Sequence, residues 1–444
     1  MKILRGININ WNKLMTEETE LVRLGDLIDI KHGYGFKGEF FSDEATRHIL
    51  LTPGNFRIGG GFLEDKKKYY DGPVNEEFVL KPNDLIITMT DLSKNGDTLG
   101  FPAIVPFSKN NELFLHNQRL GKVIIKNNEK ILKRYLYYLL TTKKYQQSIV
   151  SGATGTTVKH TSPSRILEFE FLLPTLKTQQ KIADILGSLD DKIELNRQMN
   201  QTLESMARAI FKSWFVDFDP VYAKMEGRDY PLPPEIMDLF PDELEESELG
   251  LIPKGWRVSE LGEYVKVNNS NIGKDFQYDE INYIDISSVL EGKINSSQIV
   301  DIKSAPSRAK RVVNHGDIIW SCVRPNRRSF ALLQMPSKNT IVSTGFAVIT
   351  PNYLPFTYVY SIVSRKEFSD YLTINATGSA YPAVNPQIFE NYKFVFPNEK
   401  LLFSFHDYIV DVFNKIKNNF DQIETLSSLR ELLLPNIISG KIEV

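Results

Sequence analysis

The sequence has almost no cysteine and no long hydrophobic stretch. Cys322 is the single cysteine among 444 residues, which excludes an intrachain disulfide and a zinc site built from several cysteines. No apolar run reaches the roughly 18 residues that a membrane-spanning helix needs. The N-terminal residues MKILRGININWNKLM lack an apolar segment followed by a small-residue cleavage site, so no secretion signal is expected. We therefore expect a cytoplasmic protein.

The motifs of several enzyme classes are also absent. An adenine methyltransferase should carry a glycine-rich cofactor loop and an Asp/Asn-Pro-Pro-Tyr/Phe motif, and the nearest string, DPVY at 219–222, lacks the second proline. No Gly-x4-Gly-Lys-Ser/Thr phosphate loop occurs, and the six histidines have no metal-ligand spacing. These absences favour a binding protein over an enzyme, with no catalytic residue, metal or cofactor expected in this chain.

Charge of either sign is nearly balanced, but its distribution is uneven. The net charge is −2, and residues 217–250 hold eleven acidic and two basic side chains. The rest of the chain therefore has 51 basic and 44 acidic residues. Such a mildly basic composition is compatible with nucleic-acid binding but does not require it.

The sequence contains a heptad pattern that occurs twice. Apolar residues in 175–216 recur in alternating steps of four and three, which indicates a coiled-coil helix. The pattern returns without gaps 223 residues later, in the helix expected to begin at 398. We expect the two helices to pair antiparallel. The predicted seam residues are Ile182, Leu186, Leu189, Ile193, Asn196, Asn200, Leu203, Phe405, Ile409, Val412, Ile416, Asn419, Ile423 and Leu426.

Asparagine and proline residues lead to two further expectations for these helices. Asn196, Asn200 and Asn419 fall on the seam, where a buried amide costs stability but can fix register and orientation. The alternative is that these positions are solvated. Pro435 is expected to end the second helix at the preceding residue, which would leave Ile437 outside the seam.

Each helix follows a segment of short strand-like runs broken by Gly, Pro, Asn and Asp. The run NDLIIT at 83–88 corresponds to GDIIWS at 316–321, and FEFLLP at 169–174 corresponds to YKFVFP at 392–397. Residues 130–150 have helical spacing. The offset drifts from 237 to 223 through these segments but stays constant in the helices. This pattern indicates two mixed α/β domains that differ by loop insertions.

The expected fold class is α+β, with two mixed α/β domains separated by two long helices that form an antiparallel coiled coil with pseudo-twofold symmetry. The acidic, proline-rich stretch between the halves is expected to be a linker along a surface. The expected divisions are an N-terminal extension at 1–20, a first domain at 21–174, a spacer helix at 175–216, the linker at 217–256, a second domain at 257–397, and a second helix with a C-terminal tail at 398–444.

Such an arrangement suits a divided DNA target. Helices of about 33 residues span about 50 Å at ~1.5 Å per residue. Symmetric DNA-reading modules contact major grooves that recur every ~34 Å. Two similar domains on a stiff spacer therefore fit two DNA half-sites with an unread gap between them.

Four stretches carry a resemblance to a known family. They are LPTLKTQQKIADILGSLDDKIELNRQMNQTLESMARAIFKSWFVDFDPVYAKMEG at 173–227, PPEIMDLFPDELEESELGLIPKGW at 233–256, FPNEK at 396–400, and the terminal LLLPNIISGKIEV. Together they make the chain resemble, over nearly its full length, the DNA specificity subunit of Type I restriction–modification enzymes. The second helix is the more diverged copy.

The resemblance implies a function and a set of partners. It implies two target-recognition domains, each reading half of a split double-stranded DNA sequence. The helices would form the spacer and the docking surface for two modification subunits, which bind S-adenosylmethionine and methylate adenine. Restriction subunits, which use ATP and Mg²⁺, can join such a complex. The alternatives from the sequence are a coiled-coil scaffold whose globular ends bind proteins, and a stand-alone enzyme with an unfamiliar site.

Candidate DNA contacts are loop residues, because Arg and Lys can hold phosphates while Arg, Asn and Gln can read base edges. For each, the alternative is a solvated surface charge or a turn residue. The cluster RPNRR at 324–328 is the favoured one. The candidates are Lys94, Asn95, Asn117, Gln118, Arg119, Lys159 and His160 in the first domain, and Arg308, Lys310, Arg311, Arg324, Asn326, Arg327, Arg328, Tyr381 and Gln387 in the second.

Overall fold

The chain divides into two compact units, each of which includes parts of two long helices. Unit 1 is Met1–Leu195 with Gln422–Val444, and unit 2 is Asn196–Asp421. The long helices are α5, Leu176–Phe215, and α11, Glu399–Ile438. The computed structural model describes residues 19–64, 66–91, 93, 96–108, 110–155, 158–273 and 276–442.

Unit 1 combines a four-stranded and a five-stranded sheet with short helices. Its elements are β1 Glu20–Arg23, α1 Leu24–Leu27, β2 Ile28–His32, β3 Phe41–Ser42, β4 His48–Leu51, β5 Tyr69–Tyr70, β6 Val79–Leu80, β7 Leu85–Thr88, β8 Thr90–Asp91, β9 Pro102–Ile104, β10 Leu113–His116, β11 Leu120–Ile125, α2 Lys133–Leu139, α3 Lys143–Ser151, β12 Lys159–His160, α4 Pro163–Leu167 and β13 Glu170–Leu173. The antiparallel sheet has the order β2-β11-β7-β9, and the other sheet, β3-β5-β4-β10-β6, contains the parallel pair β4 and β10.

Unit 2 also has a four-stranded antiparallel sheet, and its second sheet has four strands rather than five. Its elements are α6 Asp219–Met225, α7 Pro234–Met237, β14 Leu244–Ser247, β15 Gly250–Pro253, β16 Arg257–Glu260, β17 Val265–Val267, β18 Glu280–Ile284, β19 Val289–Leu290, β20 Lys293–Ile294, β21 Gln298–Asp301, β22 Ala309–Val312, β23 Ile318–Ser321, β24 Phe330–Leu332, β25 Thr340–Ser343, β26 Phe346–Pro351, α8 Phe356–Val363, α9 Lys366–Ile374, α10 Pro386–Glu390 and β27 Lys393–Phe396. The sheet β17-β26-β23-β24 is antiparallel, and β21-β18-β25-β22 contains the parallel pair β18 and β25.

The central strands explain why the duplication is visible in the sequence. All four residues of β7 and all four of β23 are buried. A strand covered on both faces reads as a continuous apolar run, as LIIT and IIWS do. In unit 1 strand β1 pairs with β13, and in unit 2 strand β16 pairs with β27. In each unit the first strand of the repeated domain therefore pairs with its last strand, which directly precedes a long helix.

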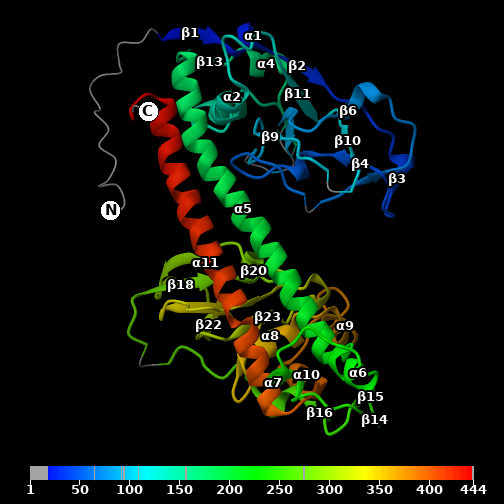
Figure 1. The fold of residues 1–444 in the computed structure, drawn as a ribbon. Helices are drawn as coiled ribbons and strands as arrows, with labels where there is room; N and C mark the ends of the chain where they lie inside the picture. Colours follow the sequence, from blue (N-terminus) through cyan, green and yellow to red (C-terminus); the bar gives the residue numbers. More distant parts are fainter. Residues whose placement is uncertain are drawn as a thin grey trace. The chain divides into compact units, whose positions relative to one another are not determined.

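Within each unit the helices α5 and α11 lie side by side (Figure 1). In unit 2, Asn419 Nδ2 donates to Asn200 Oδ1 at 2.8 Å. Further along α5, the Trp214 ring lies 5.6 Å from the ring of Phe405, which comes earlier in α11. The two segments therefore run antiparallel, with a buried amide pair between them.

Unit 1 has the same helix direction but a different polar contact. Ile182 and Ile437 belong to one apolar cluster, and Arg430 Nη1 donates to Asp190 Oδ1 at 2.8 Å. The Tyr138 hydroxyl of α2 donates to the other oxygen of Asp190 at 2.8 Å. The carboxylate thus connects both long helices to the domain of unit 1.

Each predicted seam residue is buried or half-buried, and Asn196, Asn200 and Asn419 are at most 3% exposed. The interpretation of the asparagines as solvated positions is therefore wrong. The buried surface is also wider than the predicted seam. Phe211 and Phe413 are buried in the core of unit 2, because the helices cover a domain there as well as each other.

Three sequence-based expectations differ from the structure, and the first concerns residues 217–256. This segment is not a surface linker, since it forms α6, α7 and the β14–β15 hairpin. Phe218, Phe240 and Trp256 lie in the core of unit 2. Two of the prolines, Pro220 and Pro234, occupy the first turns of α6 and α7, where a missing N–H costs nothing, so they do not break these helices.

The second difference is at Pro435, which does not end the helix. Helix α11 continues through it to Ile438, and Ile437 is 3% exposed in the core of unit 1. The proline removes one helical hydrogen bond, but Glu431, whose carbonyl loses that partner, is an exposed residue. Burial of Ile437 accompanies the extra turn and offsets this cost.

The third difference concerns residues 130–150, which form two helices rather than one. Helix α2 ends before Leu140, and α3 begins after Thr142. The Thr142 hydroxyl accepts the backbone N–H of Tyr145, so this residue caps the second helix. The apolar spacing is preserved across the break, and for this reason it did not show in the sequence.

The amide pair between the helices gives a stability prediction. Asn419→Ala leaves the buried Asn200 amide without its side-chain partner and should lower the free energy of unfolding by about 1–3 kcal/mol. Urea unfolding followed by circular dichroism measures the change. Asn418→Ala is the matched control, because Asn418 is the exposed neighbour on the same helix. Equal losses in the two variants would contradict the proposed importance of the pair.

Candidate nucleic-acid interface

In unit 1 three loop segments meet at one end of the antiparallel sheet. They are residues 89–91 after β7, residues 117–119 between β10 and β11, and the described part of 154–161 before α4. The Met89 N–H donates to the Arg119 carbonyl at 2.8 Å, and the Met89 carbonyl accepts from Thr161 N–H at 3.0 Å. We call these three segments the loop edge of unit 1.

Unit 2 builds its loop edge with the same backbone contacts. The segments are 322–328 after β23, 343–345 between β25 and β26, and 377–384 before α10. The Cys322 N–H donates to the Gly345 carbonyl at 2.9 Å, and the Cys322 carbonyl accepts from the Val384 N–H at 2.9 Å. Cys322 therefore takes the structural place of Met89.

The last segment of each loop edge contains the same tight turn. Thr154 pairs with His160 and Thr377 with Ala383, each across six residues. The glycine that follows the threonine has a φ of +93° in unit 1 and +99° in unit 2. Residues that have a Cβ rarely adopt this backbone conformation. The repeated Ala-Thr-Gly string in the sequence is thus a conformational requirement of this turn.

The predicted contacts of unit 1 lie on its loop edge, except those outside the described residues. Gln118, Arg119 and His160 are exposed, and Lys159 is half-buried. Asn117 is half-buried, and its side-chain oxygen accepts the Arg119 N–H at 2.9 Å, so it shapes the loop. Lys94 and Asn95 lie outside the described residues.

Sequence reasoning missed Tyr34, which adjoins this loop edge and is 47% exposed. Its N–H donates to the His116 carbonyl at 2.8 Å, and its carbonyl accepts the Gln118 N–H at 2.9 Å. A Cβ on Gly33 would lie 2.1 Å from the Asn117 carbonyl oxygen, so only glycine permits this approach. The sequence feature that could have indicated Tyr34 as a candidate contact is its position between two glycines, Gly33 and Gly35.

The predicted contacts of unit 2 are divided between its loop edge and neighbouring strands. Arg308 is exposed, and its carbonyl accepts the Thr344 N–H at 2.8 Å, which joins it to the loop edge. Asn326 and Arg327 are exposed on the loop after β23. Among the described residues, the Arg327 side chain has no hydrogen-bond or ion-pair partner.

Other predicted residues of unit 2 are less available. Lys310 is exposed on β22, and the half-buried Arg311 donates to Asn271 Oδ1 at 3.3 Å. Gln387 lies on α10 and donates to Asn391 at 2.8 Å. The Arg328 side chain, 19% exposed, forms an ion pair with Glu291 at 2.8 Å. Within the RPNRR cluster, Arg328 is therefore held by an ion pair, whereas the Arg327 side chain has no partner among the described residues.

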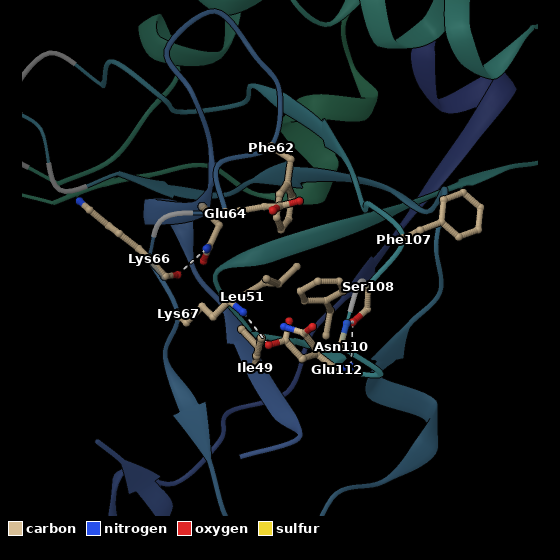
Figure 2. Close-up of a pocket in the computed structure, with 12 residues that line it drawn as sticks. Ile49, Leu51, Phe62, Glu64, Lys66, Lys67, Phe107, Ser108, Asn110 and Glu112 are labelled. Carbon is tan, nitrogen blue, oxygen red and sulfur yellow. Dashed lines mark hydrogen bonds and ion pairs between the residues drawn. The ribbon is translucent and has the colours of Figure 1, made fainter. Parts of the chain in front are cut away.

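A pocket in unit 1 is not a base-binding site. It lies between β4 and the segments around Phe62 and Phe107 (Figure 2), and its volume is about 70 Å³. Lys67 and Glu112 form an ion pair of 2.5 Å at this pocket. The space admits a few water molecules and no more.

Metal ligands and the single cysteine are two kinds of possible reactive group among the described residues. The described residues contain no group of three or more His, Cys, Asp or Glu side chains that could hold a metal ion. Burial raises the pKa of the Cys322 thiol to about 11, so the nucleophilic thiolate is disfavoured at neutral pH. No helix in the described part of the chain is sufficiently long and apolar to cross a membrane. What the loop edges present is a set of cationic and amide side chains.

His116 makes the loop edge of unit 1 sensitive to pH. Its Nε2–H donates to the Leu120 carbonyl at 3.0 Å, across the base of the loop 117–119. Burial lowers the pKa of His116 from 6.5 to about 4, while this hydrogen bond opposes the shift. Its contribution to stability is thus complete above pH 6.5 and is lost as the pH falls from 6.5 towards 4.

The consequence can be measured by urea unfolding at pH 7, 6, 5 and 4. The native chain should lose on the order of 3 kcal/mol through this residue, because each pKa unit corresponds to ~1.4 kcal/mol. His116→Gln keeps a donor without the titration and should flatten the pH profile. His32→Gln, at an exposed position, is the control and should leave the profile unchanged. Identical slopes for native and His116→Gln chains would refute the role of His116.

Comparison with known proteins relates this geometry to a family. Residues 16–205 match the family model described as the Type I restriction modification DNA specificity domain. The chain is 27% identical to the Type I restriction enzyme MjaIX specificity subunit of Methanocaldococcus jannaschii, across 74% of this chain and 73% of that protein. It is 29% identical to the HindI specificity subunit of Haemophilus influenzae, across 72% of this chain and 80% of that protein.

A solved structure agrees at the level of the fold. The S subunit of a Type I restriction–modification system from M. genitalium aligns with a TM-score of 0.56, at 14% identity, across 95% of this chain and 96% of that one. The family model includes the loop edge of unit 1, and the curated relatives are specificity subunits. The scaffold alternative is therefore not favoured. The chain is thus similar to the specificity subunits of Type I restriction–modification enzymes, and its match to the family model covers residues 16–205.

Proposed function

We propose that each unit reads one half of a bipartite double-stranded DNA target through its loop edge. The observation that supports this most is the shared backbone frame around Met89 and Cys322, which holds different side chains in the two units. Two half-sites of different sequence require a common backbone frame with different exposed side chains. The frame positions the protein on the DNA, and the contacts to the bases determine which sequence is bound. In this proposal residues 21–174 and 257–397 are the target-recognition domains.

Cations on the loop edges support DNA as the ligand. Arg119 in unit 1 and Arg308 and Arg327 in unit 2 are exposed there, and none of them is in a salt bridge within the described residues. Unpaired guanidinium groups can bind phosphates and release counterions from DNA, which favours association at low salt. The acidic residues of 217–250 belong to a different part of unit 2.

We further propose that the helices at 175–216 and 398–444 set the distance between half-sites and bind two modification subunits. A groove of about 500 Å³ between α7 and the start of α11 is a candidate surface for such a subunit. Phe403 is 51% exposed in this groove. The rim has three carboxylates and one ammonium group, that of Lys400. An apolar centre with such a rim suits an amphipathic segment of a partner that carries basic residues. The lining residues include Ile236, Leu239, Phe403, Glu235, Glu399 and Asp407.

The chemistry is assigned to the partners in this proposal. The chain is a non-catalytic subunit that carries no cofactor of its own. Modification subunits would bring S-adenosylmethionine and methylate adenine, and restriction subunits, where they join, would bring ATP and Mg²⁺ chemistry. The lack of a methyltransferase motif in the sequence supports this division of roles.

The direct test is to map methylated adenines on DNA after co-expression with the modification subunits of the source organism. A split consensus with a constant gap is expected. The purified chain alone, with labelled S-adenosylmethionine and DNA, should incorporate no methyl groups. A continuous consensus, or methylation without partner subunits, would refute the proposal.

The spacer role predicts an effect of helix length. Insertion of one heptad into α5 and one into α11, at positions that match in the antiparallel pairing, adds about 10 Å of helix. The gap between the half-sites should grow by about three base pairs, at ~3.4 Å per base pair. Both half-site sequences should stay the same, which serves as the internal control. A longer spacer with an unchanged gap would show that the helices do not set this distance.

A further inference from the structure

Two arginines of the RPNRR loop have an unusual backbone conformation. Arg324 has a φ of +52° and Arg328 a φ of +53°, and they flank the short 3-10 turn Pro325–Arg327. The left-handed region disfavours residues with a Cβ, so glycine or asparagine would be easier to place at both positions. Backbone strain of this kind is retained where the side chain is needed. We therefore ask which contacts of each arginine side chain would explain why arginine occupies these two strained positions.

The Arg328 side chain is accounted for by packing within unit 2. Its Nε donates to Glu291 Oε1 at 2.9 Å, and its Nη2 donates to the Ser364 carbonyl at 2.6 Å. Its Nη1 donates to the Arg365 carbonyl at 3.0 Å. These carbonyls follow the last turn of α8, so Arg328 attaches the loop to that helix. It is a positioning residue and is unavailable to DNA.

The Arg324 side chain has no such structural use. Its guanidinium lies 4.7 Å from the centroid of the Tyr381 ring, and this ring is 69% exposed. Its one hydrogen bond is from Nη2 to the Ala380 carbonyl at 3.3 Å, and it has no carboxylate partner among the described residues. Its backbone N–H donates to the Pro382 carbonyl at 2.7 Å, which holds the residue against the turn. The stack fixes the guanidinium and leaves most of its donors free.

We infer that Arg324 reads a guanine in the half-site bound by unit 2, with Tyr381 holding its guanidinium in position. This inference rests on the proposed function and specifies it at one base pair. A planar guanidinium with two free N–H groups matches the O6 and N7 acceptors of guanine in the major groove, whereas no other base offers two acceptors there. Arg327, which is exposed on the same loop and has no side-chain partner among the described residues, contacts a phosphate in this arrangement.

The described residues of unit 1 do not form a corresponding arginine–tyrosine stack. The shared frame aligns Met89 with Cys322, so the position of Arg324 is taken by Asp91, and the turn position of Tyr381 is taken by Val158. Burial would raise the pKa of Asp91, but hydrogen bonds from Ser93 and Thr98 lower it, since they hold the carboxylate inside its own loop. The two half-sites should therefore differ in their requirement for guanine at this position.

The experiment compares methylation consensus sequences of the complete complex containing the native chain or single variants. The native consensus should contain a G·C pair in one half-site. Arg324→Ala should reduce discrimination at that pair by about 10- to 100-fold and leave the other positions unchanged. Arg324→Lys, which keeps the charge but loses the two-point contact, should also lose discrimination while retaining the salt dependence of binding.

The control variants separate base reading from charge and from folding. Arg327→Ala should weaken binding to all sequences alike and reduce the salt slope by about one, with no change in the consensus. Tyr381→Ala should reduce discrimination in the native background but have no further effect on top of Arg324→Ala. Arg324→Gln, which fits adenine, should move the preference at that pair from guanine towards adenine and so tests the idea even if Arg324→Ala folds poorly.

Several outcomes would overturn the inference. A uniform loss of binding with a smaller salt slope in Arg324→Ala would make Arg324 a phosphate contact. An unchanged consensus in all Arg324 variants would remove it from the interface. A native complex with no split consensus would instead refute the proposed function itself, so the two failures are distinguishable.

Discussion

The antiparallel pairing of α5 and α11 is the constraint on which both units depend. Each unit uses a segment of both helices in its core. Unit 1 combines two separate stretches of chain, whereas unit 2 is the single stretch Asn196–Asp421. The contacts that hold the pairing differ between the units. Asn200 and Asn419 share a buried amide hydrogen bond in unit 2, whereas Asp190 and Arg430 form an ion pair in unit 1. Different polar contacts along one helix pair disfavour a shifted register, because a shift would leave these groups without partners.

The loop edges illustrate how a duplicated fold can present two different sets of exposed side chains on one backbone frame. Backbone hydrogen bonds at Met89 and Cys322 keep the three segments together in each unit, and they do not depend on the side chains there. The exposed residues on this frame are consequently free to differ. Anchoring residues such as Arg328 are part of the frame, although they look like contacts in the sequence.

The sequence predicts the repeated architecture well because its signals are local. Heptad spacing and buried central strands such as IIWS leave direct periodic traces. The packing of 217–256 and the burial of Ile437 depend on residues far away in the chain, so composition and a single proline gave wrong expectations. For the candidate interface, residue type could suggest arginines but could not separate Arg324 from Arg328. That difference depends on whether Glu291, or another distant group, lies within reach.

The extra turn of α11 beyond Pro435 has a consequence for biosynthesis. Ile437 completes an apolar cluster with Ile182 and Leu186, yet the ribosome makes it long after the rest of unit 1 has emerged. The apolar residues of unit 1 that Ile437 covers therefore stay exposed while unit 2 is being synthesised. A chain interrupted late in translation would lose the core of the domain made first rather than of the domain made last. Completion of the unit 1 core thus requires that the chain has been made at least as far as Ile437.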